Sequence, residues 1–268
     1  MPTIEENKRV WNSQYDWTGA GDEWSEPWGG TQNLWQYVIY PRIQMFLPAP
    51  TILEIAPGFG RWTQFLRQHC ERLIGVDITP KCVESCKSRF ANFPHVQIVQ
   101  NDGRTIPIAA DASVDFVFSF DSLVHAEADA LQAYLQEIGR VLKPSGAGFL
   151  HHSNLGQYRR LLNLSKKFPP IAIKAGEQIN IFPKANWRAE SVSASWFSSV
   201  TQQLGMSPVK QELINWRNRV FLTDCLTTLK WSPGLPKEVL RNRGFMHEAK
   251  RVRLSDERRG APNGNRAN

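Results

Sequence analysis

Two glycines and an acidic side chain follow the first apolar runs of the chain, where a ligand could bind. Gly58 and Gly60 flank Phe59 after the run 51–56, and Asp77 ends the run 73–77. A glycine turn lets the backbone approach a ligand closely, because a side chain there would block it. The carboxylate of Glu54 can hold this turn by accepting its amide hydrogens. The carboxylate of Asp77 is suited to bind both hydroxyls of a ribose, so this pattern predicts a nucleoside-binding edge.

A second acidic residue supports the prediction of a nucleoside-binding edge. Asp102 follows the apolar run 96–99, and Gly103 comes directly after it. The Asp102 carboxylate can accept hydrogens from an adenine amino group while Gly103 leaves room. A dinucleotide-binding fold shares much of this pattern, but it needs a third small residue where phosphate meets the helix amides. Here Arg61 and Trp62 follow Gly60, and the bulk of Trp62 disfavours a pyrophosphate. A nicotinamide-dependent dehydrogenase is therefore left as an alternative that binding calorimetry with NAD would decide.

The elements that must position these side chains alternate along the chain. We predict strands over 51–56, 73–77, 96–99, 114–120 and from about 146 to 151, with helices over 61–72, 80–90 and 128–142 between them. This alternation predicts right-handed βαβ units and a doubly wound, mostly parallel α/β sheet. After a helix near 193–204, the segments 209–216 and 221–229 are predicted to pair as an antiparallel hairpin at the sheet edge. In such a sheet ligands bind outside the carboxyl ends of the strands, where Gly58, Asp77 and Asp102 fall.

The segments Glu54–Gly60, Asp77, Asp102-Gly103 and Phe118–Ser122 resemble the successive motifs of class I methyltransferases that depend on S-adenosylmethionine (SAM). The resemblance covers about residues 50–153 and implies a seven-stranded sheet with an antiparallel edge hairpin. It departs from the family at Ala56, which stands where the first glycine is usual. It implies that Glu54 to Gly60 bind the methionine end of SAM, Asp77 the ribose, and Ile78, Asp102 and Gly103 the adenine. The cofactor-binding residues we predict are Glu54, Ala56, Pro57, Gly58, Gly60, Trp62, Asp77, Ile78, Asp102, Gly103, Asp121 and Ser122.

Three histidines at predicted strand ends are the candidate catalytic bases. His125 follows the fourth strand, and His151 and His152 close the fifth. A hydroxyl acceptor needs a base, and histidine is suited to that near neutral pH. Adjacent side chains on a strand point to opposite faces, so we expect one of His151 and His152 to face the acceptor. A metal held by Asp121 and a histidine is conceivable, but neither these side chains nor the four cysteines show tight ligand spacing, so we predict none.

The acceptor is the least determined part of the prediction. The segments 118–127, 149–156 and 188–192 are similar to stand-alone methyltransferases of sugar and glycan biosynthesis and other specialised metabolites. We therefore expect a small-molecule acceptor, methylated on a hydroxyl. Transfer to a nitrogen or a carboxylate is a second possibility. A third is an RNA methyltransferase that binds nucleic acid through its basic C-terminal segment.

Composition and charge predict how the chain is divided and where it acts. Residues 1–50 form a Trp-rich arm and helix, residues 51–232 the SAM-binding domain with an insertion at 155–190, and residues 233–268 a basic, solvated tail. From residue 237 onward there are nine Lys and Arg against four Asp and Glu, out of a net charge of +7 for the chain. The arm and the insertion are expected to close over the site. With no apolar run at the start and none long enough to span a bilayer, we expect a cytoplasmic protein without a membrane partner, and nucleic acid as a minor possibility.

Overall fold

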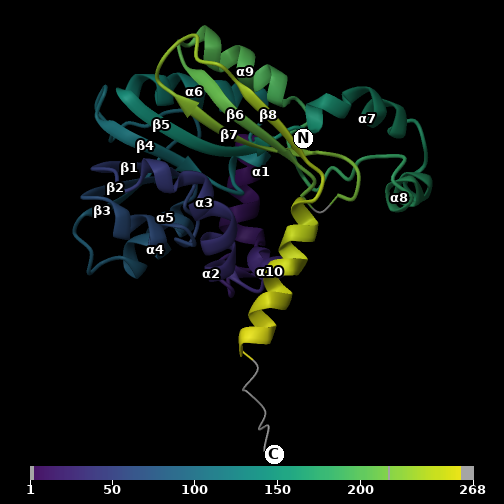
Figure 1. Ribbon diagram of the computed structural model, residues 1–268, viewed down its shortest axis with the longest axis horizontal. Helices are drawn as coiled ribbons and strands as arrows, with labels where there is room; N and C mark the ends of the chain where they lie inside the picture. The colour runs from purple at the N-terminus through teal and green to yellow at the C-terminus, as the bar shows by residue number, and fades with distance from the viewer. Residues whose placement is uncertain (1–2, 217, 261–268) are drawn as a thin grey trace, which may run out of the picture.

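The computed structural model describes residues 3–216 and 218–260, with side chains up to residue 255. Eight strands form one sheet in the order β3-β2-β1-β4-β5-β7-β6-β8 (Figure 1). Pairs among β1 to β5 are parallel, and β7 runs antiparallel to both β5 and β6. The strands are β1 Thr51–Ile55, β2 Arg72–Asp77, β3 Val96–Gln100, β4 Val114–Ser119, β5 Leu142–Ser153, β6 Ser207–Ile214, β7 Asp224–Lys230 and β8 Glu238–Asn242.

Helices cover both faces of this sheet, as the alternating sequence predicts. The α-helices are α1 Ile4–Arg9, α2 Thr31–Leu34, α3 Tyr40–Ile43, α4 Thr63–Leu66, α5 Pro80–Arg89, α6 Ala128–Val141, α7 Arg159–Ser165, α8 Pro170–Gln178, α9 Ala194–Gln203 and α10 Phe245–Gly260. Short 3-10 or π turns extend several of them: η1 Val10–Gln14, η2 Asp22–Trp28, η3 Trp35–Ile39, η4 Gln44–Phe46, η5 Arg67–His69, η6 Leu123–His125 and η7 Leu155–Tyr158. The helix predicted over 61–72 is shorter in the structure and consists of α4 followed by η5.

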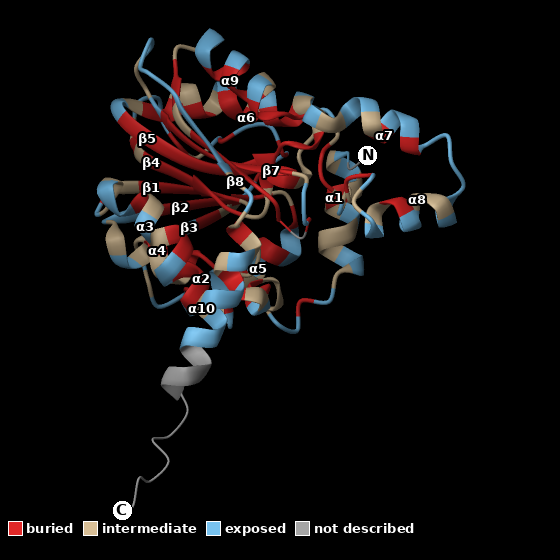
Figure 2. Ribbon diagram, turned by 45° about the vertical axis from the view of Figure 1, so that its right-hand side comes forward, coloured by how far each residue is buried: buried red, intermediate tan, exposed pale blue. Residues whose placement is uncertain are grey.

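The core is split between the two faces because successive strand residues point in opposite directions. Phe116 and Phe118 of β4 pack with Trp35, Leu66 and Cys86 on the face of α4 and α5. Val117, between them, packs on the other face with residues of α6 and α9 such as Leu135 and Phe197. The central strands are buried along nearly their whole length (Figure 2). Burial on both faces is typical of a parallel sheet inside a doubly wound fold.

The end of the chain differs from the predicted solvated tail. β8 adds an eighth strand, paired in parallel with β6, and α10 packs against η2 of the arm. Phe245 and Ala249 of α10 are fully buried, and the Phe245 ring lies 5.7 Å from that of Trp28. Phe245, Ala249 and Val252 share one helix face. This apolar spacing could have predicted a packed helix, but the prediction of a tail rested on the count of charges. The residues of β8 are exposed on both faces of the strand. The segment therefore lacks the alternation of apolar and polar residues that would have predicted a strand. Residues 261–268, which belong to the predicted tail, lie outside the described residues.

Candidate functional site

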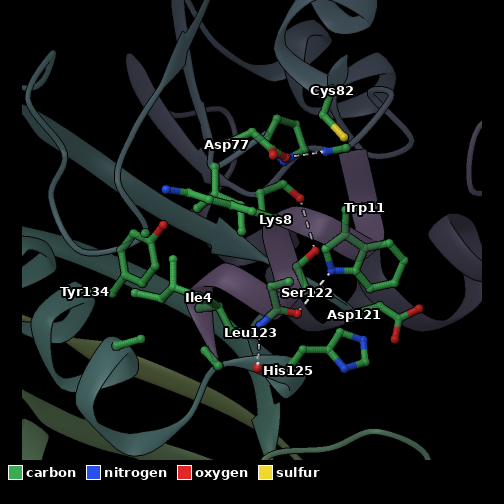
Figure 3. A pocket seen from close by; sticks show the side chains of 18 of the residues that line it. Ile4, Lys8, Trp11, Asp77, Cys82, Asp121, Ser122, Leu123, His125 and Tyr134 are labelled. Carbon is green, nitrogen blue, oxygen red and sulfur yellow. Dashed lines mark hydrogen bonds between the residues drawn. The ribbon is translucent and has the colours of Figure 1, made fainter. Parts of the chain in front are cut away.

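A cavity of about 910 Å³ opens at the carboxyl ends of β1, β2 and β4. The arm covers it from the opposite side, so that α1 and η1 face the strand ends (Figure 3). Of the twelve predicted cofactor residues, ten line this cavity: Ala56, Pro57, Gly58, Trp62, Asp77, Ile78, Asp102, Gly103, Asp121 and Ser122. Glu54 and Gly60 are not among the lining residues. The sheet topology thus brings most of the predicted residues to one place.

The turn after β1 is built from left-handed backbone. Ala56 has φ +57°, Gly58 φ +59° and Gly60 φ +85°. A side chain at Gly58 would lie 3.1 Å from the ring of Trp17, so the arm rests directly on this turn. At Gly60 an added Cβ would lie 2.4 Å from the Phe90 ring. The lack of a side chain at Gly60 therefore allows α5 to pack close to the turn. Gly60 itself does not face the cavity.

Asp77, and not Glu54 as the sequence predicts, holds the glycine turn. The Gly58 amide donates to Asp77 Oδ2 at 3.1 Å, so Asp77 holds the glycine turn. Its other oxygen accepts from the Thr79 amide and hydroxyl, and burial raises the pKa of the Asp77 carboxyl. Glu54 lies beneath the turn and accepts a hydrogen bond of 2.6 Å from the Thr63 hydroxyl. Burial raises the Glu54 pKa to about 8, and its Oε1 has no partner among the described residues.

The third strand end forms a compact turn next to an apolar surface. Asp102 Oδ1 accepts from the amides of Arg104 and Thr105, and although partial burial opposes it, these bonds lower the Asp102 pKa. Gly103 has φ +86°, and an added Cβ there would lie 3.1 Å from Ile4 and 3.2 Å from Ile78. Ile4 of α1 and Ile78 after β2 therefore meet over Gly103. The sequence pattern did not single out Ile4, because it precedes the sheet by almost fifty residues.

Asp121 is the centre of a buried charge network. Its backbone is left-handed, with φ +62°. Arg61 Nη2 donates to Asp121 Oδ2 at 3.1 Å, and Arg188 Nη2 lies 3.8 Å from Oδ1. Arg188 also pairs with the fully buried Asp224 at 2.9 Å; burial alone would raise the pKa of Asp224, but Arg188 and His151 hold it at about 2. The network joins the glycine turn, the end of β4, the insertion and β7.

Arg61 also fixes the arm over the cavity. Its guanidinium donates to the carbonyl of Gly21 at 3.2 Å. It lies 5.2 Å from the ring centre of Trp24 and 4.5 Å from that of Trp62. Burial lowers the Arg61 pKa, and the neighbouring Asp121 carboxylate opposes that shift. Arg61 was not among the predicted site residues, although its position beside the second glycine could have indicated a role in the site.

The three candidate histidines have different surroundings, and His125 alone of the three lines the cavity. Its Nδ1 lies 2.8 Å from the carbonyl of Trp187. A carbonyl only accepts, so Nδ1 carries the proton and Nε2 keeps its lone pair. Burial, with Arg188 nearby, lowers the His125 pKa to about 4. His125 is therefore a neutral acceptor at neutral pH.

His151 and His152 are fully buried and both nitrogens of each are engaged. The Asp121 amide donates to His151 Nδ1 at 3.1 Å, and Nε2 lies 3.1 Å from Asp224. His152 Nε2 lies 2.8 Å from the Thr227 hydroxyl, and its ring stacks on Phe197. The pair points to opposite faces, as expected of adjacent strand residues, but neither ring lines the cavity.

The arm contributes residues that motif analysis did not name. Trp11, Trp17 and Trp24 line the cavity and contact one another, with ring centres 5.7 to 6.1 Å apart. Trp11 also contacts His125, at 5.5 Å between ring centres. The high Trp content of residues 1–50 was the available signal. From the insertion, Trp187 reaches His125, while α7 and α8 project away from the body.

The described residues contain no group of three or more His, Cys, Asp or Glu side chains arranged to hold a metal ion. The cavity does fit SAM. The Asp77 carboxylate lines the cavity beside the glycine turn, the Ile4 and Ile78 side chains form an apolar surface, and Gly58 and Gly103 keep the strand ends open. The volume of about 910 Å³ is ample for one such ligand.

Comparison with known proteins assigns the fold and site to a class. Residues 52–146 match the family model described as a methyltransferase domain. An uncharacterized methyltransferase from Synechocystis is 26% identical over 140 residues, which cover 52% of this chain and 63% of the relative. A SAM-dependent Diels-Alderase from Talaromyces variabilis is 37% identical over 105 residues, 37% of this chain and 35% of the relative. The chain thus spans less than two thirds of either relative.

A solved SAM-dependent methyltransferase from Methanosarcina mazei superposes with a TM-score of 0.53 at 14% identity, covering 73% of this chain and 99% of that one. At that identity the likeness concerns the fold. The doubly wound sheet, the glycine turn and the acids at the next strand ends define a Rossmann-like methyltransferase domain. Residues 52–146 thus form a methyltransferase domain, for which SAM is the cofactor.

Proposed function

We propose that this protein transfers the methyl group of SAM to a small acceptor, at a hydroxyl of a sugar, a glycan precursor or a specialised metabolite. The observation that carries the proposal is the state of His125. Its Nε2 lone pair belongs to a residue that lines the cavity, and its tautomer is set by the Trp187 carbonyl. A hydroxyl placed against Nε2 could pass its proton there during transfer.

The residues of the strand ends would hold SAM across the cavity. Asp77 would bind the ribose hydroxyls, with Ile78, Asp102 and Gly103 at the adenine. Pro57, Gly58, Trp62, Asp121 and Ser122 would surround the amino-acid end. Glu54 and Gly60 would act indirectly, through the shape of the turn after β1.

SAM supplies an electrophilic methyl group, so the protein must mainly align the acceptor and exclude water. The rings of Trp24 and Trp62 flank Arg61 and give that end of the cavity an apolar wall. The charge of Arg61 is neutralised there by its ion pair with Asp121. Trp11 packs against His125 and restricts its ring. The arm would thus order the base and shield it from solvent.

Transfer to an amine or a carboxylate is the second candidate. A His125 pKa of about 4 makes it a weak base, and a lone-pair acceptor needs little help from a base. An RNA acceptor is less favoured, because part of the basic end packs on the body as α10. It would require steeply salt-dependent RNA binding, lost when Lys250, Arg251 and Arg253 are changed to Gln.

Cofactor binding is tested by calorimetry with SAM and its demethylated product. We expect Asp77→Asn to weaken binding by about tenfold or more, because a carboxylate accepting two hydroxyl hydrogens is lost. Asp115→Asn is the matched control, since Asp115 pairs with Lys143 and bonds the first residue of β1, at the other end of the sheet. No heat with either ligand for the wild type would refute the cofactor assignment.

The acceptor class is tested by screening metabolites with labelled SAM and then changing His125. For a hydroxyl acceptor we expect His125→Gln to lower kcat by about a hundredfold with SAM affinity unchanged. His152→Gln controls for loss of a buried histidine. A change within a few-fold for His125→Gln would reject His125 as the base, and would favour the amine or carboxylate reading.

A further inference from the structure

The helices α7 and α8 form a hairpin that stands out from the body of the molecule. In Figures 1 and 2 both helices lie away from the sheet, connected by residues 166–169. The hairpin has a small core of its own, because Gly176 packs so close to Phe182 that an added Cβ would lie 2.5 Å from its ring. Phe168 meets the same ring at 5.9 Å. The hairpin is therefore an ordered projection, and we call residues 166–171 its tip.

Apolar side chains gather on this projection. Twelve large hydrophobic side chains are exposed in the described part of the chain, and five of them fall in residues 164–181. Every residue of the tip, Lys-Lys-Phe-Pro-Pro-Ile, is exposed. Phe168 is 45% exposed and Ile171 81%, while Ile179 and Ile181 are 67% and 55% exposed. Single exposed apolar residues are ordinary, but a concentration on one projection marks an interaction site.

Positive charge surrounds this apolar tip. Residues 155–182 contain five basic side chains and the single acid Glu177, a net charge of +4. Lys166 pairs with Glu190. For Arg159, Arg160, Lys167 and Lys174 no ion pair is found among the residues the structure describes. An apolar surface framed by Lys and Arg matches the interface of a bilayer that contains anionic lipid.

We propose that the tip of the α7–α8 hairpin docks on an anionic lipid surface, with Phe168 and Ile171 entering the headgroup boundary and the flanking basic side chains contacting phosphates. This reverses the expectation that the chain has no membrane partner. That expectation depended on the absence of a long apolar run, and indeed no helix in the described residues is long and apolar enough to cross a membrane. A tip of a few residues lies on a bilayer rather than across it. The proposal is independent of the proposed acceptor.

Co-sedimentation of the full chain with vesicles tests this docking. Vesicles of phosphatidylcholine with about 30% phosphatidylglycerol are compared with phosphatidylcholine alone. We expect binding to the anionic vesicles that falls at high salt. The double change Lys167→Gln and Lys174→Gln should weaken it about 25-fold, about fivefold for each charge. Phe168→Ser with Ile171→Ser should weaken it by about tenfold or more.

Matched controls separate the tip from general surface effects. Val239→Ser with Leu240→Ser removes two comparably exposed apolar side chains from β8, 49% and 42% exposed. Lys250→Gln with Arg251→Gln removes two charges from α10. Both controls should bind vesicles like the wild type. The thermal midpoint and the far-UV circular dichroism of every variant are compared with the wild type, so that loss of the Phe168–Phe182 contact is not mistaken for loss of docking.

Three results would overturn the proposal. The wild type could fail to sediment with anionic vesicles, or the β8 and α10 controls could lose binding as much as the tip variants. Alternatively, sedimentation velocity without lipid could show an oligomer that the Phe168 and Ile171 changes dissociate. That last result would assign the tip to a second copy of this chain.

Discussion

Ala56 shows at the scale of one residue how the site departs from its family pattern. It occupies the first small position of the turn after β1 with φ +57°, a conformation that glycine adopts freely. An L-residue in this region costs about 1 to 2 kcal/mol. The turn therefore keeps the left-handed backbone even though the chain has alanine there. Asp121, with φ +62°, has the same left-handed backbone at the end of the neighbouring strand β4.

Ala56→Gly should raise the free energy of unfolding by about 1 kcal/mol, because relief of the left-handed strain exceeds the entropy that glycine adds to the unfolded chain. Urea denaturation measures it. Ala133→Gly, the same change inside α6, should lower stability by about 1 kcal/mol. Equal losses for both variants would show that Ala56 is not strained.

At the scale of elements, the arm completes a site that the sheet only begins. The strands bring Gly58, Asp77 and Gly103 to one edge, while α1, η1 and the loop to η2 supply the facing surface. Trp17 makes the contact between the arm and the glycine turn. Its ring stacks on Phe59 at 4.4 Å, and its indole nitrogen donates to the carbonyl of Trp11. α10 supports the arm from behind through Trp28 and Phe245.

Trp17→Ala should weaken SAM binding by about tenfold, since the arm would lose its contact with the glycine turn and close less often. Calorimetry and stopped-flow dissociation measure the affinity and the release rate. Trp231→Ala is the control, because Trp231 lies against Gly139 and Gly205, away from the cavity. If both variants lowered affinity equally, the arm would have no specific role in retention.

At the scale of the whole molecule, buried ionisable groups link stability to pH in two directions. Glu54 has a pKa of about 8 in the folded protein against 4.5 as its ordinary value. The folded state therefore holds a proton that the unfolded state has released, and stability falls as pH rises above 4.5. His125 and His152, with pKa values of about 4 and 3, act in the opposite sense. Their contribution is lost as pH falls below 6.5.

Near pH 7.5 the histidines are largely neutral in both states, so Glu54 dominates. We expect the free energy of unfolding of the protein without SAM to fall by roughly 0.8 kcal/mol per pH unit around this pH, less than the about 1.4 kcal/mol of one whole proton because Glu54 is partly ionised and the opposing histidines still contribute. Glu54→Gln, which mimics the protonated side chain, should abolish that slope in urea titrations at several pH values. His152→Gln should change it only slightly. A slope that persists in Glu54→Gln would place the responsible group elsewhere.

The cavity-lining residues at the strand ends were largely predictable, because their positions follow from local properties. A glycine turn after a buried strand and acids at the next strand ends need only the periodicity of a doubly wound sheet to meet at one edge. Ten of the predicted residues line the cavity for this reason. The arm contacts Ile4, Trp17 and Trp24 were not predictable, since their partners lie far away in sequence.

What the amino-acid sequence determined by itself is the order of β1 to β5 with the helices between them, the sheet edge where the cavity opens and the class of the domain. Tertiary structure alone decided which histidine lines the cavity, that Asp77 rather than Glu54 holds the glycine turn, and that the basic end packs as β8 and α10. The physical reason is that backbone propensity and apolar spacing are local. The tautomer of a histidine, the burial of a carboxylate and the partner of a tryptophan depend on groups that only folding brings together.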